Sequence, residues 1–257
     1  MNPPPQERIA ELERQVAQLT EQCDAARREL EAFTYAVSHD LRAPLRSVSG
    51  FSQALAELPA ETLDPKALHY LDRIQQASRK MSDLIDALLG LSRISRADLQ
   101  MRDFDLSQVC TEALTALRTR YPTHKMQAHV AQGMTAFGDS RSIRGAIDAL
   151  LDNAFKFTQS IEQPRVSLDM SPCEHGAALK IADNGAGFDM AYVDKLFRPF
   201  QRLHADPELP GLGVGLAGVQ RTVARHGGRV WADAKPSEGA TFFLFLPLQA
   251  AKIERQA

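Results

Sequence analysis

A run of nine apolar residues near the N-terminus constrains the fold of this chain more than any other feature. Consecutive members lie alternately three and four positions apart: Ile9, Leu12, Val16, Leu19, Cys23, Ala26, Leu30, Phe33 and Val37. This heptad period predicts helices that wind around each other in a left-handed supercoil. A parallel dimer sets no like charges opposite each other along this seam, and its Arg8–Glu13 pair favours it. The alternative is one amphipathic helix packed on the chain's own core.

A helical hairpin is predicted to follow the heptad run. The helical pattern continues through Leu55, and a second helix is expected from Pro65, because Asp64 can cap its N-terminus and proline suits a first turn. Apolar residues between Leu68 and Leu91 form a broad stripe on this second helix. Two such helices joined by a short loop form an antiparallel hairpin. Two hairpins together bury the wide stripe in a dimeric four-helix bundle.

The pattern changes beyond Arg96, where shorter segments predict an α+β domain. A helix is expected from the FDL tripeptide at 104–106 to about Arg120, and another over 141–157. Strands are expected near 126–130, 165–169, 178–183, 229–232 and 241–246. This part of the chain, about 150 residues long, can bury a core of its own.

The composition excludes several classes of protein. Of the 257 residues, 44% are hydrophobic and 24% charged, which excludes a wholly disordered chain. The net charge of −2 gives no basic field for nucleic acid or anionic lipid. No apolar run approaches the roughly 20 residues of a membrane span, and the N-terminus lacks the order of a secretory signal. Cys23, Cys110 and Cys173 are too widely spaced for a disulfide framework. These features predict a reduced, cytoplasmic protein.

The segment SHDLRAPLRS at 38–47 carries the first candidate for chemistry. His39 lies two residues past the seam position Val37, so its side chain is expected in solvent, and Asp40 follows it directly. A neutral imidazole is a competent nucleophile, and a neighbouring carboxylate can hold one of its ring nitrogens protonated. Pro44 is expected to bend the helix just beyond this pair. The alternative is an ordinary solvated helix face.

The segment LLDNAFKFT at 150–158 is the second candidate. Asn153 and Lys156 are three residues apart on a predicted helix, so they share a face. An amide oxygen suits Mg²⁺, and an ammonium group suits a phosphate. A surface polar pair explains the same pattern.

Two glycine-rich segments complete the set. Asp183 ends a predicted strand and is followed by Gly185 and Gly187; glycines allow a ligand to approach the backbone, and a carboxylate can accept a hydrogen bond from an adenine amino group. A plain strand-end turn is the alternative. Further on, the loop residues Gly211, Gly213 and Gly215 lead into a helix, whose free N–H groups could hold phosphate.

The roughly 25 residues between these segments form an unusually long connection. It carries Lys195, Arg198 and Arg202 and is interpreted as a lid over a nucleotide.

The order of these motifs resembles that of the bacterial sensor histidine kinases of two-component systems, over roughly residues 33–247. SHDLRAPL is similar to their phosphoacceptor box, LLDNAFKFT to the N box, and DNGAGF and GLGVGL to the two glycine boxes. LFRPFQRLH at 196–204 is similar to the phenylalanine box. Its residues are also similar to those found in kinases attached to bacteriophytochrome-like sensors.

The resemblance implies a role for each matching residue. His39 would accept the γ-phosphoryl group of ATP with help from Asp40, and Asn153 would ligate Mg²⁺ while Lys156 meets phosphate. Asp183 would bind the adenine amino group. The pocket and its lid would be shaped by Gly185, Gly187, Gly211, Gly213 and Gly215, with Phe197 and Phe200 as lid anchors.

The implied partners are a second copy of the chain, the receiver domain of a response regulator and an upstream sensor, without nucleic acid or a membrane span. The implied organisation is a linker and coiled coil (1–32), a dimerisation and phosphotransfer hairpin (33–97), a catalytic ATP-binding domain with an α/β-sandwich fold (98–249) and a tail (250–257).

Two departures from the family pattern matter. Ala149 occupies the position of a second N-box asparagine, and Ala43 stands where a threonine or asparagine often follows the phosphoacceptor. A methyl group can neither ligate a metal nor orient a water. A rival interpretation is therefore a degenerate member, which binds nucleotide as a dimeric scaffold without catalysis. Topoisomerase-like ATPases share the sandwich but lack a histidine box, so His39 argues against them.

Overall fold

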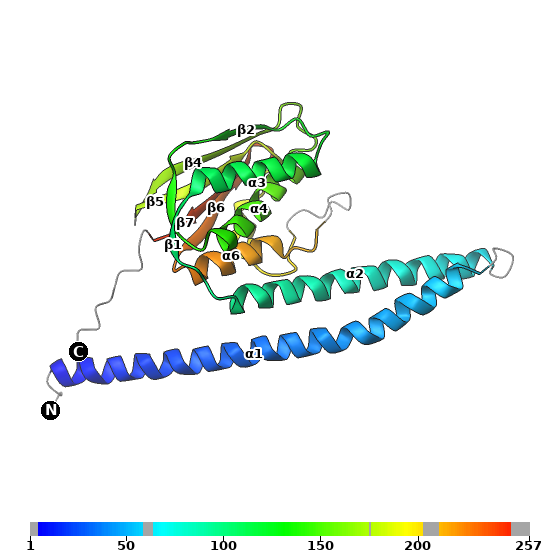
Figure 1. Cartoon of the computed structure of the whole chain (residues 1–257), viewed down its shortest axis with the longest axis horizontal. Coiled ribbons are helices and arrows are strands. Elements are labelled where there is room, and N and C mark those ends of the chain that lie inside the picture. Colours follow the sequence, from blue (N-terminus) through cyan, green and yellow to red (C-terminus); the bar gives the residue numbers. More distant parts are fainter. Residues whose placement is uncertain (1–4, 59–63, 175, 203–210, 248–257) are drawn as a thin grey trace. The chain divides into compact units, whose positions relative to one another are not determined.

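The computed structural model describes residues 5–58, 64–174, 176–202 and 211–247. The chain divides into two compact units, Met1–Ser92 and Arg93–Ala257, which are drawn in Figure 1 and are described here one at a time. The expected tail at 250–257 lies outside the described residues, as do the first four residues of the expected linker.

Two long helices make up the N-terminal unit. Helix α1 spans Pro5–Ala56 without a break at Pro44, and α2 spans Pro65–Arg96, with its last turn in the C-terminal unit. The Asp64 carboxylate accepts a hydrogen bond from the Ala67 N–H at 2.6 Å. The predicted cap and start of the second helix are therefore confirmed.

The contact between α1 and α2 is narrow and partly polar. Its apolar centre is Leu45 with Ile85 and Leu89. The hydroxyl groups of Ser49 and Ser78 are hydrogen bonded at 2.6 Å. Because this centre is small, most large apolar side chains of the hairpin remain on its surface.

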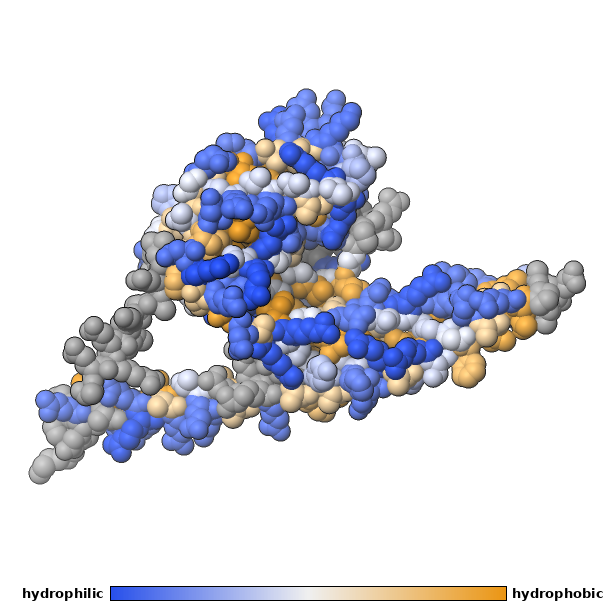
Figure 2. All heavy atoms as spheres, viewed as in Figure 1, coloured by the Kyte–Doolittle hydropathy of each residue, from blue (hydrophilic) through white to orange (hydrophobic). Residues whose placement is uncertain are grey.

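The heptad seam lies on that surface. Its members Ile9, Leu12, Val16, Leu19 and Phe33 are more than half exposed, and Phe51 further along α1 is 74% exposed. Figure 2 shows this apolar surface interleaved with hydrophilic side chains along the hairpin. The seam is thus not used to bury α1 on the core of its own chain. In the described ranges, no helix is long and apolar enough to cross a membrane.

The C-terminal unit is a sheet covered on one face by helices, as Figure 1 shows for α3, α4 and α6. The five-stranded sheet has the order β2-β4-β5-β7-β6, in which only the β2–β4 pair is parallel. The strands are β2 (Gln127–Val130), β4 (Arg165–Cys173), β5 (Gly176–Asp183), β6 (Arg229–Lys235) and β7 (Gly239–Phe245). The helices are α3 (Leu106–Arg120), α4 (Ser140–Phe157), η1 (Met190–Tyr192), α5 (Val193–Leu196) and α6 (Gly215–Arg225).

These elements confirm the α+β prediction, with one addition. All five expected strands and the three expected helices, including the one after the glycine-rich loop, are present, at bounds close to those predicted. The sequence analysis missed a two-stranded antiparallel sheet of β1 (Arg102–Asp105) and β3 (Thr135–Gly138). Three of the four residues of β1 are charged, and β3 contains Ala136 and Gly138, so neither segment has the composition of a strand.

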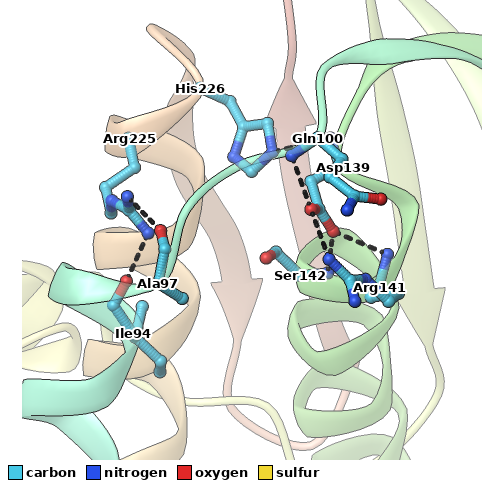
Figure 3. A network of polar contacts seen from close by, with 8 residues as sticks. All are labelled: Ile94, Ala97, Gln100, Asp139, Arg141, Ser142, Arg225 and His226. Atoms are coloured by element: carbon cyan, nitrogen blue, oxygen red, sulfur yellow. Dashed lines mark hydrogen bonds and ion pairs between the residues drawn. The ribbon is translucent and has the colours of Figure 1, made fainter.

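The first residues of the C-terminal unit are fixed by a polar network, drawn in Figure 3. The guanidinium of Arg225, at the end of α6, donates to the carbonyl oxygens of Ile94 (2.5 Å) and Ala97 (2.6 Å). The Asp139 carboxylate accepts from the Gln100 N–H at 2.8 Å, and the Asp139 N–H donates to Nε2 of the buried His226 at 3.1 Å. The chain leaving α2 is thus held by both α6 and the start of α4.

Candidate active site

A cavity of about 280 Å³ opens in the C-terminal unit between α4, the end of β5, β7 and the glycine-rich loop before α6. Nine residues that the sequence analysis singled out line it: Ala149, Asn153, Lys156, Asp183, Gly187, Arg202, Gly211, Gly213 and Gly215. They come from segments more than 60 positions apart, and the fold brings them to one cavity. Gly185, Phe197 and Phe200 do not line its wall.

One end of the cavity combines a carboxylate with aromatic side chains. The Oδ1 atom of Asp183 accepts hydrogen bonds from the N–H groups of Gly185 (2.8 Å) and Ala240 (3.3 Å). Burial raises the pKa of this carboxyl group, although both N–H groups act in the opposite direction. Phe188 and Phe242 line the same cavity, with ring centroids 6.4 Å apart. A flat apolar ring with an amino group on its edge fits such surroundings.

Two glycines are required by the backbone around this cavity. Gly187 has a φ of +58°, and a Cβ atom there would collide with the carbonyl oxygen of Lys235. Gly213 has a φ of +71°, and a Cβ atom there would lie 2.5 Å from the Gln201 carbonyl oxygen. Larger residues at these two positions would deform the cavity wall.

Helix α4 contributes three polar side chains to the cavity wall. Asn153 and Lys156 lie on the face that was predicted, and Asp152 lines the cavity beside them. The Lys156 ammonium lies 2.6 Å from the Asp152 carboxylate. Burial tends to raise the pKa of Asp152, but the hydrogen bonds from Lys156 and Tyr121 outweigh it and lower that pKa. The sequence analysis missed Asp152, although its spacing of four from Lys156 is that of a helical ion pair.

The connection between Asp183 and α6 contains η1 and α5. Beyond them, the Phe200 N–H donates to the Gly213 carbonyl at 2.8 Å, which ties this connection to the glycine-rich loop. Phe200 has a φ of +62°, and its side chain is 42% exposed. The backbone of Phe200, more than its ring, therefore makes the contact. The end of the expected lid, residues 203–210, lies outside the described residues.

His39 belongs to the N-terminal unit, where it lies exposed on α1 as expected. Its Nδ1 atom is 3.2 Å from Oδ1 of Asp40, and both side chains are largely in solvent. In the tautomer whose Nδ1–H donates a hydrogen bond to this carboxylate, Nε2 carries no proton and its lone pair is available.

The donor set of the cavity suits a magnesium ion that arrives with a nucleotide. No group of three or more histidine, cysteine or acidic side chains that could hold a metal by itself occurs in the described part of the chain. The amide of Asn153 supplies one hard oxygen on the cavity wall. Mg²⁺ in such sites is held by one or two protein oxygens together with substrate phosphates and water. Ala149 lines the same cavity and adds no oxygen.

Two family models match separate parts of this chain. Residues 29–97 match the family model described as the His Kinase A (phospho-acceptor) domain. Residues 138–250 match the model described as the histidine kinase-, DNA gyrase B-, and HSP90-like ATPase. The chain therefore belongs to the sensor histidine kinases, and the resemblance seen in the sequence is confirmed.

Among sensor histidine kinases, the chain is similar to phytochrome-like members. It is 29% identical to phytochrome-like protein Cph1 of Synechocystis over 91% of this chain and 31% of that protein. It is 31% identical to cyanobacterial phytochrome B of Nostoc over 90% of this chain and 31% of that protein. The chain thus spans about a third of the length of these relatives.

A solved structure supports the fold. The full-length ShkA structure in complex with AMPPNP matches 83% of this chain and 45% of its own, with a TM-score of 0.59 and 24% identity.

Proposed function

We propose that this chain uses ATP to phosphorylate itself on His39 and then passes the phosphoryl group to an aspartate of a response regulator. The observation that carries the proposal is the cavity in which Asn153, Lys156 and Asp183 meet, within the segment that matches the ATPase family. The exposed His39 within the segment that matches the phospho-acceptor family supplies the acceptor.

In this proposal the cavity binds and orients ATP. Asp183 accepts a hydrogen bond from the adenine amino group, and the rings of Phe188 and Phe242 cover the base. Lys156 neutralises phosphate charge from α4, and the loop around Gly213 and Gly215 offers backbone N–H groups at the start of α6. Mg²⁺, bound by Asn153 and the phosphates, would supply charge neutralisation. Phosphoryl transfer depends on such alignment and charge stabilisation more than on covalent work by the protein.

The transfer step uses the lone pair on Nε2 of His39. Nε2 forms a bond to the γ-phosphorus as the bond between that phosphorus and the bridging oxygen breaks, and ADP leaves with the electron pair. Asp40 keeps Nδ1 protonated and stabilises the positive charge that develops on the ring. The aspartate of the regulator then attacks the same phosphorus and releases His39 for another cycle.

We also propose that the chain acts as a homodimer under the control of a sensor. The support for a homodimer is the exposed heptad seam, because two such seams bury each other in a coiled coil. The support for a sensor is that the phytochrome relatives are about three times as long as this chain. A cytoplasmic location agrees with the substrate, ATP.

The experiment that tests the proposal is incubation with γ-labelled ATP and Mg²⁺. We expect a label on the protein that is labile in acid and stable in alkali, as for phosphohistidine. His39→Gln should abolish labelling while ATP binding is retained, because the cavity belongs to the other unit. The matched control is His69→Gln, since His69 is also an exposed histidine on a helix of the hairpin. Labelling of the His39→Gln variant would disprove the assignment.

The second candidate is a scaffold that binds nucleotide without transferring phosphate. Ala149, which adds no metal-ligating group to the cavity, is the observation that favours it. The same experiment separates the two: the scaffold binds ATP and never becomes labelled. Transfer of label to a purified receiver domain would complete the case for the kinase.

A further inference from the structure

Asp152 and Lys156 form a partly buried ion pair on the wall of the cavity. They lie one turn apart on α4, and Nζ of Lys156 is 2.6 Å from Oδ2 of Asp152. Only about a fifth of each side chain is exposed, and both residues line the cavity. An ion pair this short and this shielded restricts where the lysine ammonium can lie.

The second carboxylate oxygen of Asp152 is held from a different helix. Oδ1 accepts a hydrogen bond from the Tyr121 hydroxyl at 2.8 Å and another from Nη1 of Arg120 at 3.3 Å, both at the end of α3. The Tyr121 ring is in turn stacked on Phe155, with centroids 5.5 Å apart. The carboxylate is therefore fixed on one side by α3 and holds the lysine on the other.

We infer that Asp152 is a positioning residue for nucleotide binding, which keeps the Lys156 ammonium aimed along the cavity wall. This inference rests on the proposed function, in which Lys156 meets phosphate. A lysine side chain without a partner samples many rotamers, and fixing one of them costs binding free energy. The ammonium has three N–H donors, so it can bond to Asp152 and to a phosphate oxygen at the same time.

The opposing effect is repulsion between the Asp152 carboxylate and the phosphates. Three donors, from Lys156, Tyr121 and Arg120, share that negative charge, so the cluster as a whole is not anionic. The gain from holding Lys156 in place therefore exceeds the repulsion, and removal of the carboxylate weakens the binding of phosphates.

The test compares the binding of Mg-ATP and of adenosine to the full chain by calorimetry. Asp152→Asn removes the charge and keeps the shape of the side chain. We expect it to weaken ATP binding roughly fivefold and to leave adenosine binding unchanged, since adenosine has no phosphates. Asp148→Asn is the matched control, because Asp148 forms an ion pair of the same spacing with Arg144 on α4 but does not line the cavity.

A double-variant cycle separates positioning from a general structural effect. In a Lys156→Met background, Asp152→Asn should cause no further loss of ATP affinity, because no ammonium is left to position. Tyr121→Phe removes one hydrogen bond to Asp152 and keeps the stacked ring, so it should weaken ATP binding about twofold without changing adenosine binding. This variant also serves as the test if Asp152→Asn does not fold.

Several results would overturn the inference. They are unchanged or tighter ATP binding by Asp152→Asn or Tyr121→Phe, an equal loss for adenosine, and a loss that persists in the Lys156→Met background. The proposed function fails separately, and the inference with it, if the unmodified chain binds neither ATP nor adenosine.

Discussion

The carboxylate of Asp139 caps α4 and provides a quantitative prediction for stability. It is 2% exposed, and its oxygens accept hydrogen bonds from the N–H groups of Arg141 and Ser142 (3.0 Å each) and of Gln100 (2.8 Å). Burial alone would raise the pKa of Asp139, but the bonds from Gln100 and Ser142 and the Arg141 guanidinium lower it to about 2. The ionised carboxylate is thus a net stabilising group of the fold.

The size of the effect follows from these contacts. The difference between the ordinary pKa of 3.8 and about 2 corresponds to roughly 2 kcal/mol in favour of the ionised form. Replacement of an N-cap residue by alanine lowers the free energy of unfolding by about 1–2 kcal/mol. This cost and the one from the pKa shift are not additive, because both arise partly from the same hydrogen bonds. We therefore expect Asp139→Ala to lower the free energy of unfolding of the C-terminal unit by about 2–3 kcal/mol.

The assay is urea unfolding of the full chain followed by tryptophan fluorescence. The chain has one tryptophan, Trp231, which lies on β6 and stacks on Phe243, so the signal reports on the C-terminal unit. A loss of 2–3 kcal/mol should also lower its melting temperature by about 5–10 °C.

The contribution of Asp139 to the stability of the fold depends on pH. Because folding lowers the pKa of Asp139, its contribution is complete above its ordinary pKa of 3.8 and is lost as the pH falls through about 2. The stability difference between the unmodified chain and Asp139→Asn should therefore shrink over that window. Asp105→Ala is the control, since Asp105 caps α3 through one hydrogen bond to the Gln108 N–H and should cost only about 1 kcal/mol. If Asp139→Ala costs no more than this control, the reasoning is refuted.

Two further predictions concern the cavity. Gly187→Ala should abolish ATP binding, because its Cβ would collide with the Lys235 carbonyl at a φ of +58°. Gly133→Ala has a similar φ with no atom within 4 Å, so in calorimetry it should leave ATP affinity unchanged; equal behaviour of the two variants would contradict this. Ala149→Asn should lower the Mg²⁺ concentration needed for half-maximal labelling by ATP, since it adds an oxygen to the cavity wall; an unchanged magnesium titration would show that the added amide does not reach the metal.

The sequence predicted the parts of this fold that depend on local patterns. Asp64 and Pro65 predict the start of a helix through capping chemistry alone. The apolar periods of the long helices and of the five main strands can be recognised without knowledge of the tertiary fold. The strands β1 and β3 were missed because their residues, RDFD and TAFG, do not have the composition of a strand, and only their pairing with each other defines them.

The site was predicted as a set of residues but not as a geometry. Motif order named Asn153, Lys156 and Asp183, and the fold places all three on one cavity. Asp152 was missed although it lies four positions before Lys156, and its contact with the Tyr121 hydroxyl, from 31 positions away at the end of α3, has no local pattern that could reveal it. Phe200 was expected to anchor the lid; its backbone N–H makes the contact with Gly213, and no side-chain pattern encodes a backbone contact.

Helix α6 begins at the cavity and ends at the polar network that holds the chain leaving α2. Its first residue, Gly215, lies on the cavity wall. Its last residue, Arg225, donates hydrogen bonds to the carbonyl oxygens of Ile94 and Ala97. Its eleven residues give a helix about 16 Å long. The wall of the cavity and the attachment of the chain that leaves α2 are therefore built on opposite ends of one short helix.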